Sequence, residues 1–454
     1  MLKRRLSFAG IFSLAGKAVA VLTSLISYFL LARMLSPAGL GAYFIALSIV
    51  IYGSLLGALG LERVAVRYIA ESLGFKEFDR ARRVVSLVFR LGIVGSAAAS
   101  LTYLCFGRVL GVTLFDSPEL AGATALIAGW LAAMALLRLY IETFRGFQDF
   151  LLASLLDGGY SGVLLCSCLG LLWWLGIRSL SLANAISLTI ISALAVIIFA
   201  SWRLHNRVKR LPRETKGTQI EAEARGAQVT AREMVRVAWP LLITNIVLFA
   251  TSEQAYPQLW ILGAFRPAEE VAIYGAAMKL GLIVSMPWAI SNSVVPPLIA
   301  EMYVQGEMGE LTTVLRATTA LAFIPALLAS LALILLGGPI LGLTFGSTYK
   351  VGAMVLALLS VGMLVIVWAG PCHMTLMMTG YQTRMMVIAS ASAALAIVGS
   401  IMVAGQYGAV GVALVASTST VLQTILLWLT TRVSTGLWTH VSFRELLRLA
   451  RKGW

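Results

Sequence analysis

Four basic side chains stand inside long apolar runs of this sequence, where a charge is costly and therefore informative, and three of them lie away from the end of the run. Lys17 lies in the run 8–31, Arg90 in 84–106 and Lys279 in 271–296. An ammonium or guanidinium at the centre of a bilayer costs about 2.5–3.5 kcal/mol unless it meets an anion, water or protein. The pattern predicts that these three residues bind a negatively charged substrate. The alternatives are pairing with a carboxylate, or a long side chain that reaches the headgroups.

Two acidic side chains also fall inside apolar runs, namely Asp157 and Glu253. Carboxylates at membrane depth often mark proton or sodium pathways. Each is therefore a candidate for coupling transport to H⁺ or Na⁺, or for neutralising one of the basic residues as a charge pair.

A second charged group follows the second apolar run, in the sequence LERVAVRYIAES. Glu62, Arg63, Arg67 and Glu71 are candidate gate residues that could close a pathway through local salt bridges. Anchoring to lipid headgroups explains them equally well. Arg138, at the end of the fourth run, is expected to extend to the headgroups.

The composition fits only a membrane protein, because 59% of the 454 residues are hydrophobic and 12% are charged, against about 25% charged in soluble domains. The four cysteines form no CxxC pair and the three histidines are scattered, so we expect no metal site, disulfide framework or cofactor. Nucleic acid is not an expected partner of so apolar a chain.

Hydropathy and helix-breaking residues predict an all-α polytopic fold with about twelve membrane spans. The spans are expected at 8–31, 41–61, 84–106, 120–140, 151–175, 179–201, 237–262, 271–296, 314–336, 351–371, 384–404 and 409–431.

The distribution of basic residues predicts the orientation of these spans. With the N-terminus in the cytoplasm, the outer segments hold only Arg33, Arg108, Arg178, Arg266 and Lys350, and most of the other Lys and Arg residues fall in cytoplasmic segments. Such a bias is typical of cytoplasmic loops. Both termini are therefore expected in the cytoplasm of a multi-pass protein.

The long basic stretch 202–236 divides the chain into two halves of six spans each. We expect an N-terminal lobe at 1–201, a cytoplasmic linker at 202–236, a C-terminal lobe at 237–431 and an amphipathic cytoplasmic tail at 432–454. A shift of 230 residues aligns Ile69-Ala70-Glu71 with Ile299-Ala300-Glu301, which indicates a repeat. Because six is even, the repeat is parallel, and alternating access by rocking of two lobes follows as a hypothesis.

Several longer motifs carry a resemblance to a known family. They are LLARMLSPAGLGAYFIALSI and GALGLERVAVRYIAES in the first half, then LGAFRPAEEVAIYGAAMKL, VVPPLIAEMYVQG, LTFGSTYKVGAMVLALLSVG and the TGYQ turn in the second. The chain resembles bacterial oligosaccharide flippases of the polysaccharide transporter group, in the multidrug/oligosaccharidyl-lipid/polysaccharide exporter superfamily, and most nearly the O-antigen flippases. Two positions depart from the family pattern. Gln258 stands where an acidic residue is frequent, and Ala272 where glycine is usual.

The resemblance implies a V-shaped pair of six-helix lobes, a central cavity and a polyprenyl-pyrophosphate-linked oligosaccharide as cargo. It also implies the bacterial cytoplasmic (inner) membrane, a role in O-antigen or exopolysaccharide synthesis, and candidate partners among polysaccharide polymerases and glycosyltransferases, besides membrane lipids. In related flippases the cavity is cationic, and Lys17 and Lys279 approximately match such positions.

Three functions remain in competition. The favoured one is a flippase, which is a transporter and not an enzyme. An ion-coupled multidrug exporter of the same superfamily is the alternative, although basic residues at membrane depth oppose a cationic cargo. A polysaccharide polymerase or ligase ranks lower, because such enzymes are expected to present a large outer loop and the outer loops here are short.

Overall fold

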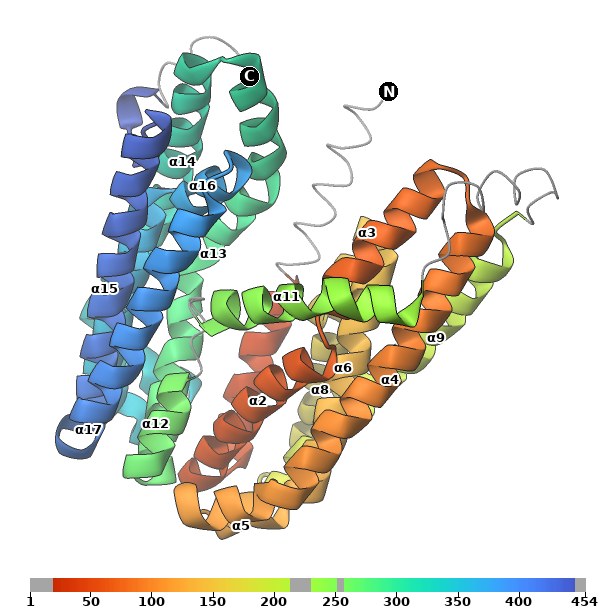
Figure 1. Cartoon of the computed structure of the whole chain (residues 1–454). Helices are drawn as coiled ribbons and strands as arrows, with labels where there is room; N and C mark the ends of the chain where they lie inside the picture. Colours follow the sequence, from red (N-terminus) through yellow and green to blue (C-terminus); the bar gives the residue numbers. More distant parts are fainter. Residues whose placement is uncertain (1–18, 213–229, 251–256, 446–454) are drawn as a thin grey trace. The chain divides into compact units, whose positions relative to one another are not determined.

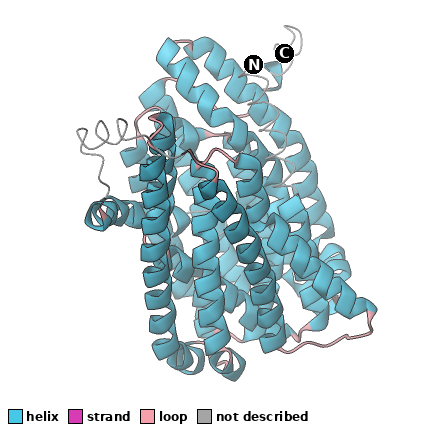
Figure 2. Cartoon of the chain, turned by 90° about the vertical axis from the view of Figure 1, so that its right-hand side faces the viewer, coloured by secondary structure: helices cyan, strands magenta, loops and turns pink. Residues whose placement is uncertain are grey.

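The computed structural model describes residues 19–212, 230–250 and 257–445, and within them every regular element is a helix (Figures 1 and 2). Nine of the described helical segments are long and apolar enough to cross a membrane, and Val19–Met34 is a shorter apolar helix. These segments confirm the prediction of an all-α, multi-pass membrane protein.

The chain forms two compact units, Met1–Ile246 and Val247–Trp454. The first contains the helix Val19–Met34 followed by α2 (Pro37–Gly57), α3 (Leu61–Gly74), α4 (Phe78–Val109), η1 (Leu110–Leu114), α5 (Pro118–Gly122), α6 (Thr124–Gly146), α7 (Phe150–Ser154), η2 (Leu155–Gly159), α8 (Tyr160–Trp174), α9 (Leu182–Lys209) and most of α11 (Ala231–Ala250). The second contains α12 (Pro257–Phe265), α13 (Ala268–Gln305), α14 (Met308–Thr344), η3 (Ser347–Gly352), α15 (Ala353–Ala369), α16 (Cys372–Met378) and α17 (Gln382–Thr435).

One predicted span has a different form in the structure. The seventh, 237–262, corresponds to two helices, α11 and α12, and the division between the units falls inside α11. The eleventh and twelfth, 384–404 and 409–431, agree with the two halves of α17, whose chain reverses at the non-helical residue Gly408 (φ +54°). Glu270 stabilises this reversal, because its Oε1 accepts a hydrogen bond from the backbone N–H of Ala409 at 2.7 Å while its Oε2 lies 2.6 Å from Nε of Arg266.

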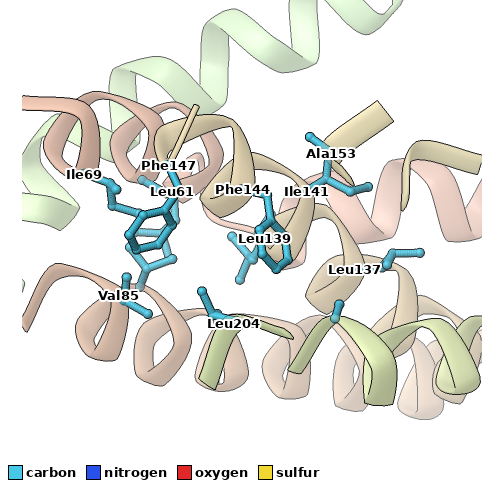
Figure 3. Close-up of a cluster of buried hydrophobic side chains, with 14 of the residues drawn as sticks. Leu61, Ile69, Val85, Leu137, Leu139, Ile141, Phe144, Phe147, Ala153 and Leu204 are labelled. Atoms are coloured by element: carbon cyan, nitrogen blue, oxygen red, sulfur yellow. The ribbon is translucent and has the colours of Figure 1, made fainter. Parts of the chain in front are cut away.

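The first unit is built around a buried apolar cluster (Figure 3). Side chains of α3, α4, α6, α7 and α9 meet there, and Leu61, Ile69, Leu139 and Phe144 are at most 2% exposed. Met234 and Ala238 on α11 belong to the same cluster, so α11 packs on this unit, where it runs across the other helices (Figure 1).

Gly60 lies where the backbone of α11 comes closest to the rest of the first unit. It precedes α3 in a left-handed conformation (φ +72°), and a Cβ at this position would lie 2.4 Å from the carbonyl oxygen of Ala238 and 2.8 Å from the backbone nitrogen of Leu242. Neither atom belongs to a flexible side chain. Only glycine therefore allows this backbone approach without displacing α11.

We predict that Gly60→Ala lowers the stability of the protein by about 2 kcal/mol or more, because a left-handed non-glycine residue and a clash with backbone occur together. The loss should appear as a lower melting temperature of the detergent-purified protein. Gly122→Ala is the control, since a Cβ there meets no atom within 4 Å. Equal melting temperatures for Gly60→Ala and Gly122→Ala would show that α11 does not need this close contact.

The residues after α17 pack back against the second unit. Val441 N–H donates to the carbonyl of Trp368 at 3.0 Å, and the Thr439 hydroxyl donates to the carbonyl of Ala369 at 2.7 Å. Thr319 on α14 donates to the carbonyl of Thr439 at 3.0 Å, and Leu437 is 1% exposed. This part of the tail, which was predicted to be an amphipathic helix, has no helical turn between Gly436 and Ser442.

His440 is at the centre of this docked segment. Its Nδ1 lies 3.3 Å from the indole N–H of Trp428, its Nε2 lies 3.1 Å from Nη2 of Arg316, and the rings of Trp368 and Trp438 pack around it. Both neighbouring nitrogens are donors, so protonation of the imidazole would remove its remaining acceptor. Burial, and then the charge of Arg316, lower the pKa of His440.

We predict that the segment 437–445 becomes less firmly docked as the pH falls below about 6.5, the ordinary histidine value. A histidine with a lowered pKa in the folded state stabilises that state above the unfolded value, and the contribution is lost as the pH falls. Amide hydrogen exchange of 437–445, corrected for intrinsic rates, should therefore rise between pH 7.5 and 5.5. His440→Phe should abolish the pH dependence, and a similar rise in that variant would assign the effect to another group.

Candidate functional site

The predicted substrate-binding residues lie in different units. Lys279 is on α13 of the second unit with 4% of its surface exposed, in a stretch that also buries Tyr274 and Met278. Arg90 is on α4 of the first unit and is exposed. Lys17 lies outside the described residues, as does Glu253. Of the three predicted substrate-binding residues, Lys279 is therefore the one that is buried in the described part of the chain.

Glu62 and Arg138 form a half-buried ion pair inside the first unit. Glu62, in the first turn of α3, is 9% exposed, and its Oε1 lies 3.5 Å from Nη1 of Arg138 on α6. Nε of Arg138 donates to the hydroxyl of Ser54 on α2 at 3.1 Å. One guanidinium thus joins three helices. Arg138 does not simply extend toward the headgroups, because it is held by partners within its own unit.

Asp157 lies at a break in the fifth span. The π-helical segment η2 contains two non-helical residues, Asp157 (ψ +61°) and Gly158 (φ +93°), and breaks of this kind are frequent at functional positions. Oδ2 of Asp157 is 2.9 Å from Nη2 of Arg145, which also contacts Glu142 one turn earlier on α6. Asp157 therefore has a basic partner in the structure, and its side chain is 53% exposed.

The other gate candidates differ in their surroundings. Oε1 of Glu71 lies 3.3 Å from Nη2 of Arg80, which is also 2.9 Å from Glu77 through Nη1. Arg63 and Arg67 are exposed, and Arg67 lies over the ring of Tyr68 at 5.9 Å from its centroid. The pairs Glu71–Arg80 and Glu62–Arg138 each connect helices of the same unit.

Sequence reasoning missed several partners in these ion pairs, namely Arg80, Glu77, Glu142 and Arg145. Glu77 and Arg80, like Glu142 and Arg145, are spaced i,i+3, a signal that was available in the sequence. The contact between Arg145 and Asp157 was not available, because it depends on the break at η2.

Gln258 replaces the acidic residue that the family resemblance led us to expect in the seventh span. It is 3% exposed on α12, and its Oε1 has no hydrogen-bond partner among the described residues. A buried neutral amide cannot take up a proton or hold a cation by charge, so this position offers no ionisable group.

We predict that Glu62→Gln destabilises the protein by about 1–3 kcal/mol, because the half-buried guanidinium of Arg138 loses its counter-charge. The double variant Glu62→Gln/Arg138→Met should recover much of this loss in a double-mutant cycle of unfolding or thermal inactivation. Arg67→Ala, an exposed arginine of the same helix without an ion pair in the described part of the chain, is the control. Additive losses in the double variant would mean that the 3.5 Å pair contributes nothing.

Comparison with known proteins places this geometry in context. The family model described as "Polysaccharide biosynthesis protein" matches residues 8–303. No curated protein matches the chain.

The fold is similar to solved transporter structures. An inward-facing multidrug resistance MATE family transporter of the MOP superfamily has a TM-score of 0.70 and 16% identity, covering 94% of this chain and 98% of that chain. The lipid II flippase MurJ in an inward closed conformation has a TM-score of 0.67 and 14% identity, covering 96% and 89%. A MOP superfamily transporter from Pyrococcus furiosus, with a binding pocket described as having reverse polarity, has a TM-score of 0.62 and 15% identity, covering 94% of each chain. The chain therefore has the fold of MOP superfamily transporters.

Proposed function

Since the chain belongs to the polysaccharide biosynthesis protein family, we propose that it is a flippase for a polyprenyl-pyrophosphate-linked oligosaccharide. The cargo would cross the bacterial cytoplasmic (inner) membrane by alternating access of the two units. Its sugar and diphosphate would pass through the protein while the prenyl chain stays in the lipid. Both termini would face the cytoplasm, in line with the distribution of basic residues.

The observation that carries the proposal is the buried ammonium of Lys279 in a chain of this family. A diphosphate brings at least one negative charge into a region of low dielectric constant, where an opposite charge has a strong effect. Lys279 supplies such a charge from α13. Lys17 would supply a second one from the first span, and this part of the proposal rests on the sequence. Arg90, exposed on α4, would contact the diphosphate nearer the membrane surface.

The ion pairs of the first unit suggest which of the remaining charged candidates form structural charge pairs and which could act in gating or ion coupling. Asp157 would act as a charge pair with Arg145, from which it lies 2.9 Å away, and Glu62 would hold α3 to α6 through Arg138. Glu71 would hold α3 to α4 through Arg80. Arg63 and Arg67, which are exposed on the same helix, would be the residues of this group that close an inner gate. Coupling to H⁺ or Na⁺ would then fall to Glu253.

The charge of Lys279 is the first part of the proposal to test. We predict that Lys279→Ala lowers surface polysaccharide by about tenfold in a cell whose own flippase gene is deleted, because a charge-assisted contact to phosphate is lost. Lys279→Arg should retain more activity, since it keeps the charge. Lys350→Ala, an exposed lysine of the same unit, is the control and should rescue fully.

Protein levels in the membrane must be equal for these variants to be compared. Full rescue by Lys279→Ala would contradict the role of this ammonium. If the wild-type protein failed to restore polysaccharide but lowered cell sensitivity to cationic drugs, the multidrug exporter would replace the flippase as the conclusion.

A further inference from the structure

A groove opens between the two halves of α17, at the end of the hairpin away from Gly408. It has a volume of about 470 Å³ and is lined by Arg384, Val387, Ile388, Leu429, Val433 and Ser434, among others. We call this the hairpin groove. It belongs to one element of one unit, so its geometry does not depend on how the two units are arranged.

The walls of the hairpin groove are apolar and open to the surroundings. Val387 is 61% exposed, Leu429 45% and Val433 81%. Val387 lies near the beginning of α17, and Leu429 and Val433 lie near its end. Because α17 is long and apolar enough to cross a membrane, we expect lipid close to the headgroup level to meet these side chains. The volume is in the range of sites for small molecules, which is about 300–1,000 Å³. An acyl chain fits such walls by chemistry and by size.

The same end of the hairpin carries two arginines. Arg384 donates to the hydroxyl of Ser434 at 2.8 Å and lies over the ring of Tyr381 at 5.3 Å from its centroid, while Arg432 contacts the carbonyl of Gly436 and the ring of Trp438. Within the described part of the chain, no carboxylate lies within ion-pair distance of either. A guanidinium has five N–H donors, so Arg384 retains donors that a phosphate can accept from.

We propose that the hairpin groove is a binding site for an anionic glycerophospholipid, with an acyl chain between Val387 and Val433 and the phosphate on Arg384. We expect an anionic phospholipid to bind in preference to a zwitterionic one. Its headgroup neutralises Arg384, which has no acidic partner among the described residues. The distribution of basic residues predicts that this end of α17 faces the cytoplasm, where anionic lipids attract basic side chains. The bound lipid would fix the hairpin relative to the membrane surface, independently of the cargo.

The test is native mass spectrometry of the full chain equilibrated with equal amounts of phosphatidylglycerol and phosphatidylcholine. Arg384→Ala should lower retained phosphatidylglycerol about fivefold, the factor typical of one basic residue near an anionic surface, and leave phosphatidylcholine unchanged. Arg178→Ala is the matched control, because Arg178 also lies over an aromatic ring, that of Trp173, in the first unit. It should retain the wild-type ratio.

A second variant tests the groove itself. Val433→Trp adds bulk at a highly exposed position, so it should fold normally while it fills the groove and reduces retention of both lipids. An unchanged lipid ratio in Arg384→Ala, or unchanged retention in Val433→Trp, would overturn the proposal. Displacement of phosphatidylglycerol by an equimolar polyprenyl phosphate would also overturn it, since the groove would then hold the prenyl chain of a cargo. None of these outcomes bears on whether Lys279 is needed for transport.

Discussion

The structure of this protein depends on how the cost of burying charged side chains among apolar helices is offset. A buried charge is tolerated when a counter-charge, a hydrogen-bond partner or a ligand offsets its lost hydration. In the first unit the half-buried carboxylate of Glu62 is offset by Arg138, and the more exposed carboxylate of Asp157 also has a basic partner, Arg145. These pairs join helices that the apolar cluster already packs together. In the second unit the ammonium of Lys279 is 4% exposed, and we propose that an anionic cargo is one of the groups that offset its charge.

The internal pairs narrow the choice of gate residues. A gate that opens must exchange partners between the two units at low cost, whereas a half-buried ion pair within one unit is costly to break. Glu62 and Glu71 are engaged within the first unit by Arg138 and Arg80. We propose that the exposed arginines of the same helix, Arg63 and Arg67, are the residues that change partners when the gate opens.

Hydropathy was enough to predict most of the membrane-spanning helices, because a membrane span needs a long apolar run and its ends are marked by charge. Hydropathy and helix-breaking residues separated the eleventh and twelfth spans close to Gly408, but they could not predict the contact at this reversal, in which Glu270 bonds to the backbone at Ala409. Nor could they predict that α11 packs on the first unit. That contact needs a left-handed glycine at position 60 and a backbone approach, neither of which leaves a trace in hydropathy.

The candidate site was less predictable than the fold, because it also depends on tertiary contacts that hydropathy does not record. Hydropathy locates a charge along a helix axis but not around it. It therefore made Arg90 and Lys279 candidates without showing that the side chain of Arg90 is exposed and that of Lys279 is buried. Exposure alone does not decide function either, because an exposed arginine can bind a lipid headgroup, as we propose for Arg384. The sign of the charge, its burial and the presence of an acidic partner have to be considered together. On these grounds we propose that the chain binds anions at two depths, a diphosphate near Lys279 and a phospholipid at Arg384.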